Sequence, residues 1–489
     1  MLHGGRLGDV RSDVAKFCSS RKDDVRLAEA VLAINKAHVA MLMEQKIIQR
    51  QSGAKILSSL QKINTLELDP NAEDVHMAIE EVVLVETGPE VGGNLHIAKS
   101  RNDQVATAIR MALREQLLII MQQILDMQQA LLETASKHTE TIILEYTHLQ
   151  AAQPVTFAHY LLFHTEALGR DLQRLQSAYT RVNLSPLGAG ALATTSFPIN
   201  RKKTAELLGF SDVLENSLDA VGSRDFIIET QATLALLAIN LSRFAEDLIV
   251  WSSAEFGTIE LPDEFTSTSS IMPQKKNPEV LEVIRARASY ALGDFLAAAA
   301  AVKSLPTTYN LDFQEVTPKL WASTDNLEAS LKIFIALIPN IKVKTDKVEE
   351  KAARGFVAAT EVANMLVSKY GVAFRTSHKI VGALVKALIG EGKTLSDATP
   401  QLLSKVAMES AGVKLAVSSD DLASCTNLPK LIGTYRVQGG PAPIEVKRAI
   451  AAKTKSLAQS ETEIKHKKQG LIEAQKALDG IVNSYSTSQ

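Results

Sequence analysis

The segment TSTSSIMPQKKNPE, residues 266–279, has the side chains best suited to binding an anionic ligand. Five consecutive Ser and Thr residues precede Lys275 and Lys276. Asn277 and Pro278 then predict a helix start, with Asn277 as the N-cap and Pro278 at the first helical position. Backbone N–H groups at a helix start, together with two lysines, would attract carboxylates. The alternative interpretation is a solvated loop between two helices.

A second candidate for anion binding is SRNDQV at 100–105. Ser100 is a suitable N-cap, and Asp103 stands three residues on, as in a capping box. Arg101 and Asn102 then fall in the first turn, where a guanidinium and an amide at the positive end of a helix suit a carboxylate. The alternative is a helix that is simply well capped.

The segment YTHLQAAQP at 146–154 offers a titratable group, since Thr147 and His148 stand shortly before the break expected at Pro154. A histidine can take up or release a proton near neutral pH, which makes His148 a candidate acid or base. A single histidine is more often structural than catalytic, so the segment alone does not decide.

The string GAGALA at 188–193 matches a dinucleotide-binding fingerprint, but the sequence RVNLSP before it does not predict the β-strand that this fingerprint requires. A tight turn between helices is therefore the preferred interpretation. The ten histidines show no metal-ligand spacing such as HExxH. We expect neither a cofactor nor a metal.

Long helices must position these segments. Apolar residues recur at spacings of three and four over 109–131 and 234–248, and further helices are expected over 156–181 and 278–302. The first seam is heptad-like, which predicts a helix of roughly 30 residues packed nearly parallel to its neighbours. No alternating strand–helix pattern is present. The fold class is therefore predicted to be all-α, with a long central helix bundle.

The chain is expected to divide near residues 105 and 350. The three parts are an N-terminal helical domain (1–105), a central long-helix bundle domain (106–350) and a C-terminal helical domain (351–489). In the tail of the last part, apolar residues recur every seven positions from Ile450 to Leu478. The pattern favours an amphipathic helix lying on the body, dispensable for chemistry, over a separate coiled-coil partner site.

Composition limits the classes of partner. There are 53 Lys and Arg residues against 55 Asp and Glu, so the strong basic excess typical of nucleic-acid binders is missing. Cys18 and Cys425 lie far apart, which argues against a disulfide framework and for a reducing compartment. The first residues lack the apolar core of a signal peptide, and no apolar run reaches the length of a membrane span. We expect a cytoplasmic protein that binds neither nucleic acid nor membrane.

Taken together, the motifs resemble those of the fumarase/aspartase superfamily, and specifically of the argininosuccinate lyase family. The resemblance covers roughly residues 4–450. The loop SSIMPQKKNP is the most specific match, because sister families carry other residues where this chain has Gln274, Lys275 and Lys276. The other matching segments are SRNDQV, YTHLQAAQPVTFAHYLL, SPLGAGALATTSFPINRKKTAELLGF, NSLDAVGSRDF and LPTTYNLDFQE.

The resemblance implies cleavage of argininosuccinate to arginine and fumarate without a cofactor, the last step of arginine biosynthesis. It implies a homotetramer built on a bundle of long helices, with each active site shared between three chains. By motif position, the implied catalytic residues are Ser269, His148, Glu282 and Lys275. The implied substrate-binding residues are Ser20, Arg101, Asn102, Thr147, Asn277, Tyr309 and Gln314.

The implied chemistry is a β-elimination through a carbanion whose charge spreads onto a carboxylate. Lys275 and nearby N–H donors would stabilise that charge, which is commonly the largest catalytic contribution. Ser269 could be the base if the same loop stabilises its alkoxide, and His148, oriented by Glu282, could then protonate the leaving nitrogen. The sequence leaves the reverse assignment open. A mobile serine-rich loop fits a lid that closes over substrate.

Several positions depart from the family pattern. Ile97, Ala98 and Lys99 stand where Thr-Gly-Arg is common, Thr317 replaces a substrate-binding lysine, and Thr268 replaces a loop glycine. Two rivals follow: a sister lyase acting on another succinyl compound, and a catalytically silent structural protein. The retained catalytic set argues against the silent protein.

Overall fold

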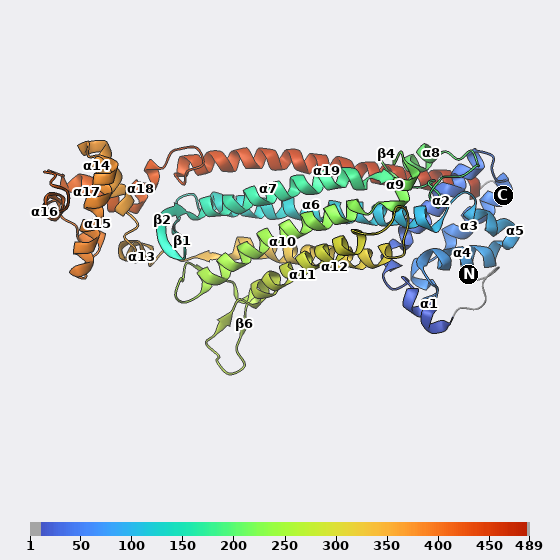
Figure 1. The fold of residues 1–489 in the computed structure, drawn as a ribbon, viewed down its shortest axis with the longest axis horizontal. Helices are drawn as coiled ribbons and strands as arrows, with labels where there is room; N and C mark the ends of the chain where they lie inside the picture. Colours follow the sequence, from blue (N-terminus) through green and yellow to red (C-terminus); the bar gives the residue numbers. More distant parts are fainter. Residues whose placement is uncertain (1–10, 487–489) are drawn as a thin grey trace.

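The computed structural model describes residues 11–486, which form a long rod of helices (Figure 1). The first ten and last three residues, including the start of the chain on which the signal-peptide prediction rests, lie outside the described residues. The predicted all-α class is confirmed, since nineteen α-helices and only short strands occupy 11–486. None of the described helices combines the length and the apolar character needed to cross a membrane.

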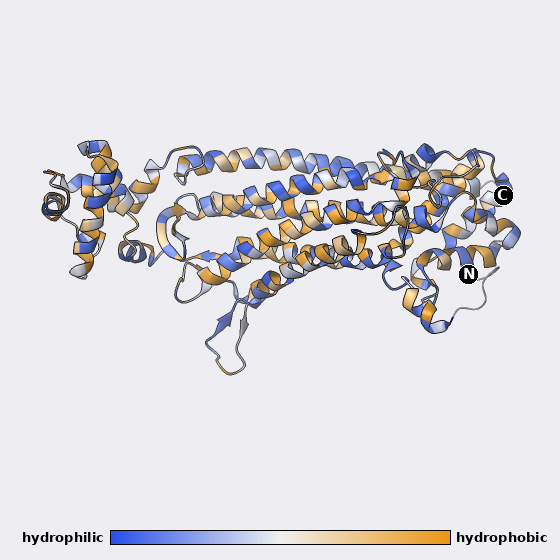
Figure 2. Cartoon of the chain, viewed as in Figure 1, coloured by the Kyte–Doolittle hydropathy of each residue, from blue (hydrophilic) through white to orange (hydrophobic). Residues whose placement is uncertain are grey.

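Five long helices form the middle of the rod. They are α6 (Arg101–Lys137), α7 (Phe157–Val182), α10 (Asp225–Ser252), α11 (Glu279–Val302) and α12 (Phe313–Leu337). The seam predicted over 109–131 lies in α6, where Leu113, Leu117 and Ile124 are completely buried. The helices predicted over 156–181, 234–248 and 278–302 are α7, α10 and α11. Figure 2 shows apolar residues concentrated where these helices face one another.

The helix starts follow local chemistry, with one correction. Ser100 and Asp103 form the predicted capping box at the start of α6. The predicted N-cap at Asn277 is wrong: α11 begins at Glu279, and Asn277 pairs with Ser267 in a short hairpin. A residue before proline disfavours helical backbone angles, which accounts for the extended Asn277.

Smaller helices cover both ends of the rod. At the N-terminal end these are α1 (Ser12–Cys18), α2 (Ala28–Glu44), α3 (Arg50–Lys62), α4 (Val75–Thr87) and α5 (Pro89–Gly92). Between α7 and α10 lie α8 (Arg201–Leu207) and α9 (Ser217–Gly222). At the other end are α13 (Val348–Arg354), α14 (Ala359–Tyr370), α15 (Phe374–Gly390), α16 (Pro400–Ala411), α17 (Ser419–Thr426) and α18 (Leu428–Thr434). Helices α14 to α17 surround a hydrophobic cluster distinct from that of the bundle.

The predicted tail helix is confirmed as α19 (Pro443–Ser486), which runs back along the bundle (Figure 1). Its seam residues Ile464 and Leu478 are completely buried in the main hydrophobic cluster. The seam is therefore filled by the chain's own helices, and removing the tail would uncover part of this core. The division of the chain near 105 and 350 stays a prediction.

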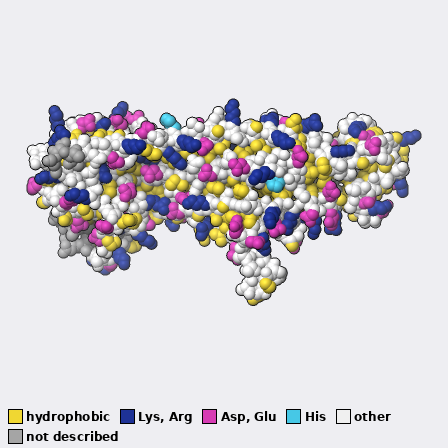
Figure 3. Space-filling model, turned by 180° about the vertical axis from the view of Figure 1, so that it is seen from behind, with side chains coloured by type: hydrophobic (Ala, Val, Ile, Leu, Met, Phe, Trp, Pro, Cys, Tyr) yellow, Lys and Arg dark blue, Asp and Glu magenta, His cyan; other side chains and the backbone are white. Residues whose placement is uncertain are grey.

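Two hairpins were not predicted. Strand β1 (Ile142–Thr147) pairs with β2 (Gln150–Thr156) at the end of the bundle away from the N-terminal helices. Strand β6 (Ser267–Thr268) pairs with β7 (Lys276–Asn277), and this β6–β7 hairpin projects from the rod. Seen from behind, the hairpin again stands clear of the body, and hydrophobic side chains are exposed along the middle of the rod (Figure 3). Two further pairs of short strands are β3 (Leu184–Ser185) with β4 (Asp212–Val213), and β5 (Ile259–Glu260) with β8 (Lys342–Val343).

Candidate active site

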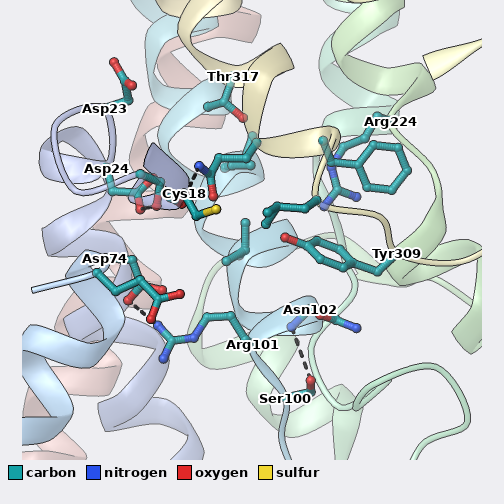
Figure 4. A pocket seen from close by; sticks show the side chains of 17 residues that line it. Cys18, Asp23, Asp24, Asp74, Ser100, Arg101, Asn102, Arg224, Tyr309 and Thr317 are labelled. Atoms are coloured by element: carbon teal, nitrogen blue, oxygen red, sulfur yellow. Dashed lines mark hydrogen bonds and ion pairs between the residues drawn. The ribbon is translucent and has the colours of Figure 1, made fainter. Parts of the chain in front are cut away.

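A cavity of about 370 Å³ lies where the N-terminal helices meet the bundle (Figure 4). Its volume is within the range of small-molecule sites. Five predicted substrate-binding residues line it: Ser20, Arg101, Asn102, Tyr309 and Gln314. They come from three separate stretches of the chain, around residues 20, 101 and 309–314, so that only the fold brings them together.

Three long helices begin at this cavity. The first residue of α6, Arg101, lines it, as do the N-cap of α10, Arg224, and the first residue of α12, Phe313. A helix start carries a partial positive charge and unpaired N–H groups, and these favour anions. The arrangement therefore suits a ligand with carboxylates.

The wall of the cavity opposite Arg224 and Tyr309 is acidic, and its carboxylates were not predicted from the sequence. Asp23, Asp24 and Asp74 lie on this side in Figure 4. Ser20 donates a hydrogen bond to Asp24, and burial raises the pKa of Asp24 to about 6. Asp74 forms an ion pair with Arg101. The sequence offered one signal for this wall, the spacing of four residues between Ser20 and Asp24. That spacing does not show which way the Asp24 side chain points.

The remaining cavity contacts are polar and close. Gln314 Nε2 donates to the backbone oxygen of Cys18 at 3.0 Å, and Asn102 Nδ2 donates to that of Ala191 at 3.0 Å. Burial raises the pKa of the Tyr309 hydroxyl, which therefore stays protonated at neutral pH and can donate to a ligand. The cavity is thus lined by amide and hydroxyl groups as well as charges.

Thr147 and His148 lie far from this cavity, at the tip of the β1–β2 hairpin. Thr147 pairs with Gln150, and the two central residues have positive φ, 55° for His148 and 58° for Leu149. Two such residues make a type I′ turn, a conformation uncommon for side chains other than Gly, Asn and Asp. The turn leaves His148 exposed on the surface of the described chain. It is presented to the outside of the chain.

The β6–β7 hairpin carries Ser269, Lys275 and Asn277. Ser269 Oγ accepts hydrogen bonds from the backbone N–H groups of Ile271 and Met272 at 3.3 and 3.2 Å. Donors placed in this way favour negative charge on the oxygen. They are the kind of loop contacts that a serine alkoxide would need.

The two lysines of this hairpin differ. Lys276 Nζ lies 2.6 Å from Asp263 Oδ1 and 3.8 Å from Glu260 Oε1, so its charge is compensated at the base of the hairpin. Lys275 is exposed and has no ion pair within the described residues. Both lysines were predicted to attract an anion. Because Lys276 already has carboxylate partners, we now expect this role for Lys275 alone. Glu282 follows in the first turn of α11, also exposed.

Within one chain, the cavity residues and His148 do not come together. Arg101 starts α6 and lines the cavity, whereas β1 begins five residues after the end of α6 at Lys137. A helix of 37 residues spans about 55 Å at about 1.5 Å per residue. His148 therefore lies roughly a full bundle length from the cavity, and no single chain holds both in one site.

The glycine string 188–193 forms the predicted tight turn. Gly188 and Gly190 have φ of +85° and +62°, and both backbone N–H groups donate to Asp103 Oδ2 at 2.9 Å. A Cβ on Gly190 would lie 2.8 Å from the backbone oxygen of Thr194. These glycines therefore hold Asp103 and the start of α6, and the N–H groups are already occupied.

The departures from the family pattern fall in two places, around the cavity and on the β6–β7 hairpin. Thr317 lines it and is buried. Ala98 has φ of +60°, a backbone conformation that glycine adopts more readily. Lys99 is buried and donates to Asn35, and burial lowers its pKa to about 7. Thr268 Oγ1 donates to the backbone oxygen of Pro273 within the hairpin, at 3.4 Å.

Comparison with protein families gives two matches. A family model described as lyase matches residues 11–293, and one described as argininosuccinate lyase C-terminal matches residues 356–429. The argininosuccinate lyase of Methanocaldococcus jannaschii is 44% identical over 484 residues, which cover 98% of this chain and 99% of that protein. The argininosuccinate lyase of Methanococcus maripaludis strain C5 is 44% identical over 458 residues, covering 92% and 94%.

Solved structures agree on the fold. The crystal structure of EDDS lyase in complex with formate has a TM-score of 0.91 and 31% identity, covering 95% of this chain and 92% of that one. The class II fumarase of Schistosoma mansoni has a TM-score of 0.70 at 15% identity, covering 83% and 91%, and shares the fold alone.

Proposed function

The chain belongs to the argininosuccinate lyase family of the fumarase/aspartase superfamily and is a carbon–nitrogen lyase, and we propose how its residues cleave argininosuccinate to arginine and fumarate. Two argininosuccinate lyases are 44% identical to this chain over nearly its whole length, which supports this reaction. Within the chain, the gathering of five expected substrate contacts around one cavity is the observation that carries the proposal. In this role the enzyme completes arginine biosynthesis in the cytoplasm.

The proton to be removed lies on the carbon next to a succinyl carboxylate. Lys275 and Asn277 bind the succinyl carboxylates, so that the ammonium of Lys275 meets the charge that develops there. Ser269 acts as the base, because two backbone N–H groups donate to its oxygen and would stabilise negative charge there. His148, oriented by Glu282, protonates the nitrogen that leaves as part of the guanidinium of arginine. Each proton transfer is worth about 10²–10⁴-fold in rate.

Ser20, Asn102, Tyr309 and Gln314 hold the rest of the substrate in the cavity. Thr147, beside His148, contacts the substrate from the opposite side. Arg101 is already paired with Asp74, so we assign it to shaping the cavity and orienting Asn102.

The active enzyme is a homotetramer whose sites each take residues from three chains. The separation of the cavity from His148 supports this assembly, since neither half is a complete site. Exposed apolar residues on α11 provide surface that association would bury; Val283, Tyr290, Leu292 and Leu296 are 44 to 67% exposed. Apolar surface of this kind marks interaction sites. The division near 105 and 350 would then separate the N-terminal helices, the bundle and the outer C-terminal part.

Incubating the purified protein with argininosuccinate tests the reaction, because fumarate is detected by its ultraviolet absorbance. We expect fumarate and arginine in equal amounts, without added metal or cofactor. Other N-succinyl amines serve as comparison substrates, since Thr317 changes the part of the cavity away from the succinyl group. Faster release of fumarate from one of them would identify a sister lyase.

A further inference from the structure

Arg224 is a cavity-lining residue without an evident role in the family's expected site. It is the N-cap of α10 and is 1% exposed. Its Nη1 donates to the backbone oxygens of Val221 and Ser223, at 3.2 and 2.9 Å. Its Nε and Nη2 are buried and have no hydrogen-bond partner in the part of the chain that the structure describes. Figure 4 places it beside Tyr309, across the cavity from the acidic wall.

The charge of Arg224 is uncompensated. Two cations line the cavity among the described residues, and Arg101 is paired with Asp74. Among residues 11–486, no carboxylate forms an ion pair with Arg224, and the Phe313 ring stacks on it, with 4.5 Å between Cζ and the ring centroid. Burial lowers the pKa of Arg224 to about 10, so the guanidinium remains charged at neutral pH. A buried charge of this kind is costly unless an anion pairs with it.

The substrate provides one carboxylate that needs such a partner. Argininosuccinate has two carboxylates on its succinyl half and one on its arginine half. The succinyl pair is assigned to Lys275 and Asn277 on the hairpin of another chain, which approaches from outside the cavity. The third carboxylate therefore has to be bound by the cavity itself, where Thr317 offers no charge.

We infer that Arg224 binds the α-carboxylate of the arginine half of the substrate and makes the cavity specific for an amino-acid end group. This inference rests on the proposed function, because it takes argininosuccinate as the substrate. Arg224 is then a specificity-determining residue. The position of its backbone at the start of α10 adds to the attraction, because that helix end also favours an anion.

Measuring two substrates distinguishes a loss of substrate specificity from a loss of structure. The second substrate is the analogue in which agmatine replaces arginine, so that only the α-carboxylate is missing. Wild-type kcat/KM is expected to be roughly 10²-fold or more lower for the analogue, because a buried carboxylate–guanidinium contact is lost. Arg224→Gln is expected to lower kcat/KM for argininosuccinate by a similar factor and to leave the analogue nearly unaffected, so that the preference disappears. Arg224→Lys keeps the charge and is expected to keep part of the preference.

Arg110→Gln is the matched control. Arg110 is also a buried arginine with backbone oxygens as acceptors, an unpartnered Nε and an aromatic ring beneath it, but it does not line the cavity. This variant is expected to keep the wild-type preference even if its stability falls. An Arg224→Gln enzyme that loses activity equally on both substrates would overturn the inference, as would a wild-type enzyme without preference, a result that needs no variant to fold. Absence of fumarate from wild-type protein with either substrate would instead contradict the proposed function.

Discussion

Two inactive variants should restore each other's activity if the site is shared between chains. The perturbation is a pair of substitutions, Asn102→Ala at the cavity and His148→Ala at the β1–β2 turn. Within one chain these positions are separated by almost the whole of α6, about 55 Å for its 37 residues. A small substrate cannot bridge that distance. Any working site must therefore take Asn102 and His148 from different chains.

The expected recovery follows from counting. A site works when its cavity comes from the His148→Ala chain and its histidine from the Asn102→Ala chain. Each condition holds about half the time in a randomly mixed closed oligomer, so roughly a quarter of the sites should be active. A histidine and a cavity from the same chain would give no working site at any mixing ratio.

The assay co-expresses the two chains with different affinity tags and isolates hybrids by sequential purification. Fumarate release is then compared with that of wild-type protein and of each variant alone. Mixing the two assembled variants without dissociation is the control and should give no activity. Hybrids that are verified by both tags and remain inactive would refute the shared site, even with the lyase activity of the wild-type protein established.

Four further predictions concern single positions. Ser269→Ala should lower turnover by roughly 10²-fold or more with the circular dichroism spectrum unchanged, and near-normal turnover would remove it from the mechanism. Glu282→Gln should shift the pH–rate profile through His148, so an identical profile would show that they are uncoupled. Leu478→Ala, in the buried seam of α19, should lower the free energy of unfolding by about 2–5 kcal/mol in urea titrations, with the activity of folded protein retained. Burial lowers the pKa of His38 from 6.5 to about 3, so only the unfolded chain is protonated in this window and stability falls as the pH falls through it. His38→Gln should reduce that pH dependence by one proton, and an unaltered slope would contradict the assignment.

Short-range features were largely readable from the sequence. The capping box at Ser100 and Asp103 depends on residues three positions apart, and the seams of α6 and α19 depend on spacings of three, four and seven. These interactions act between neighbours along one helix, so the pattern of residue types is enough to predict them. The β1–β2 hairpin was missed because its turn is formed by His148 and Leu149, which are not typical turn residues at positive φ.

Charge balance and distance, in contrast, were decided by tertiary structure. Lys275 and Lys276 are adjacent in the sequence, yet among the described residues only Lys276 has a carboxylate partner, Asp263 thirteen residues away. Arg101 is paired with Asp74, whereas Arg224 at the same cavity has no carboxylate partner within residues 11–486. The sequence by itself determined which helices form and which motifs carry the chemistry, because these depend on neighbouring residues. Only the fold determined which charges remain available and which motifs are too far apart to meet, because electrostatic interactions depend on distance in space and on burial.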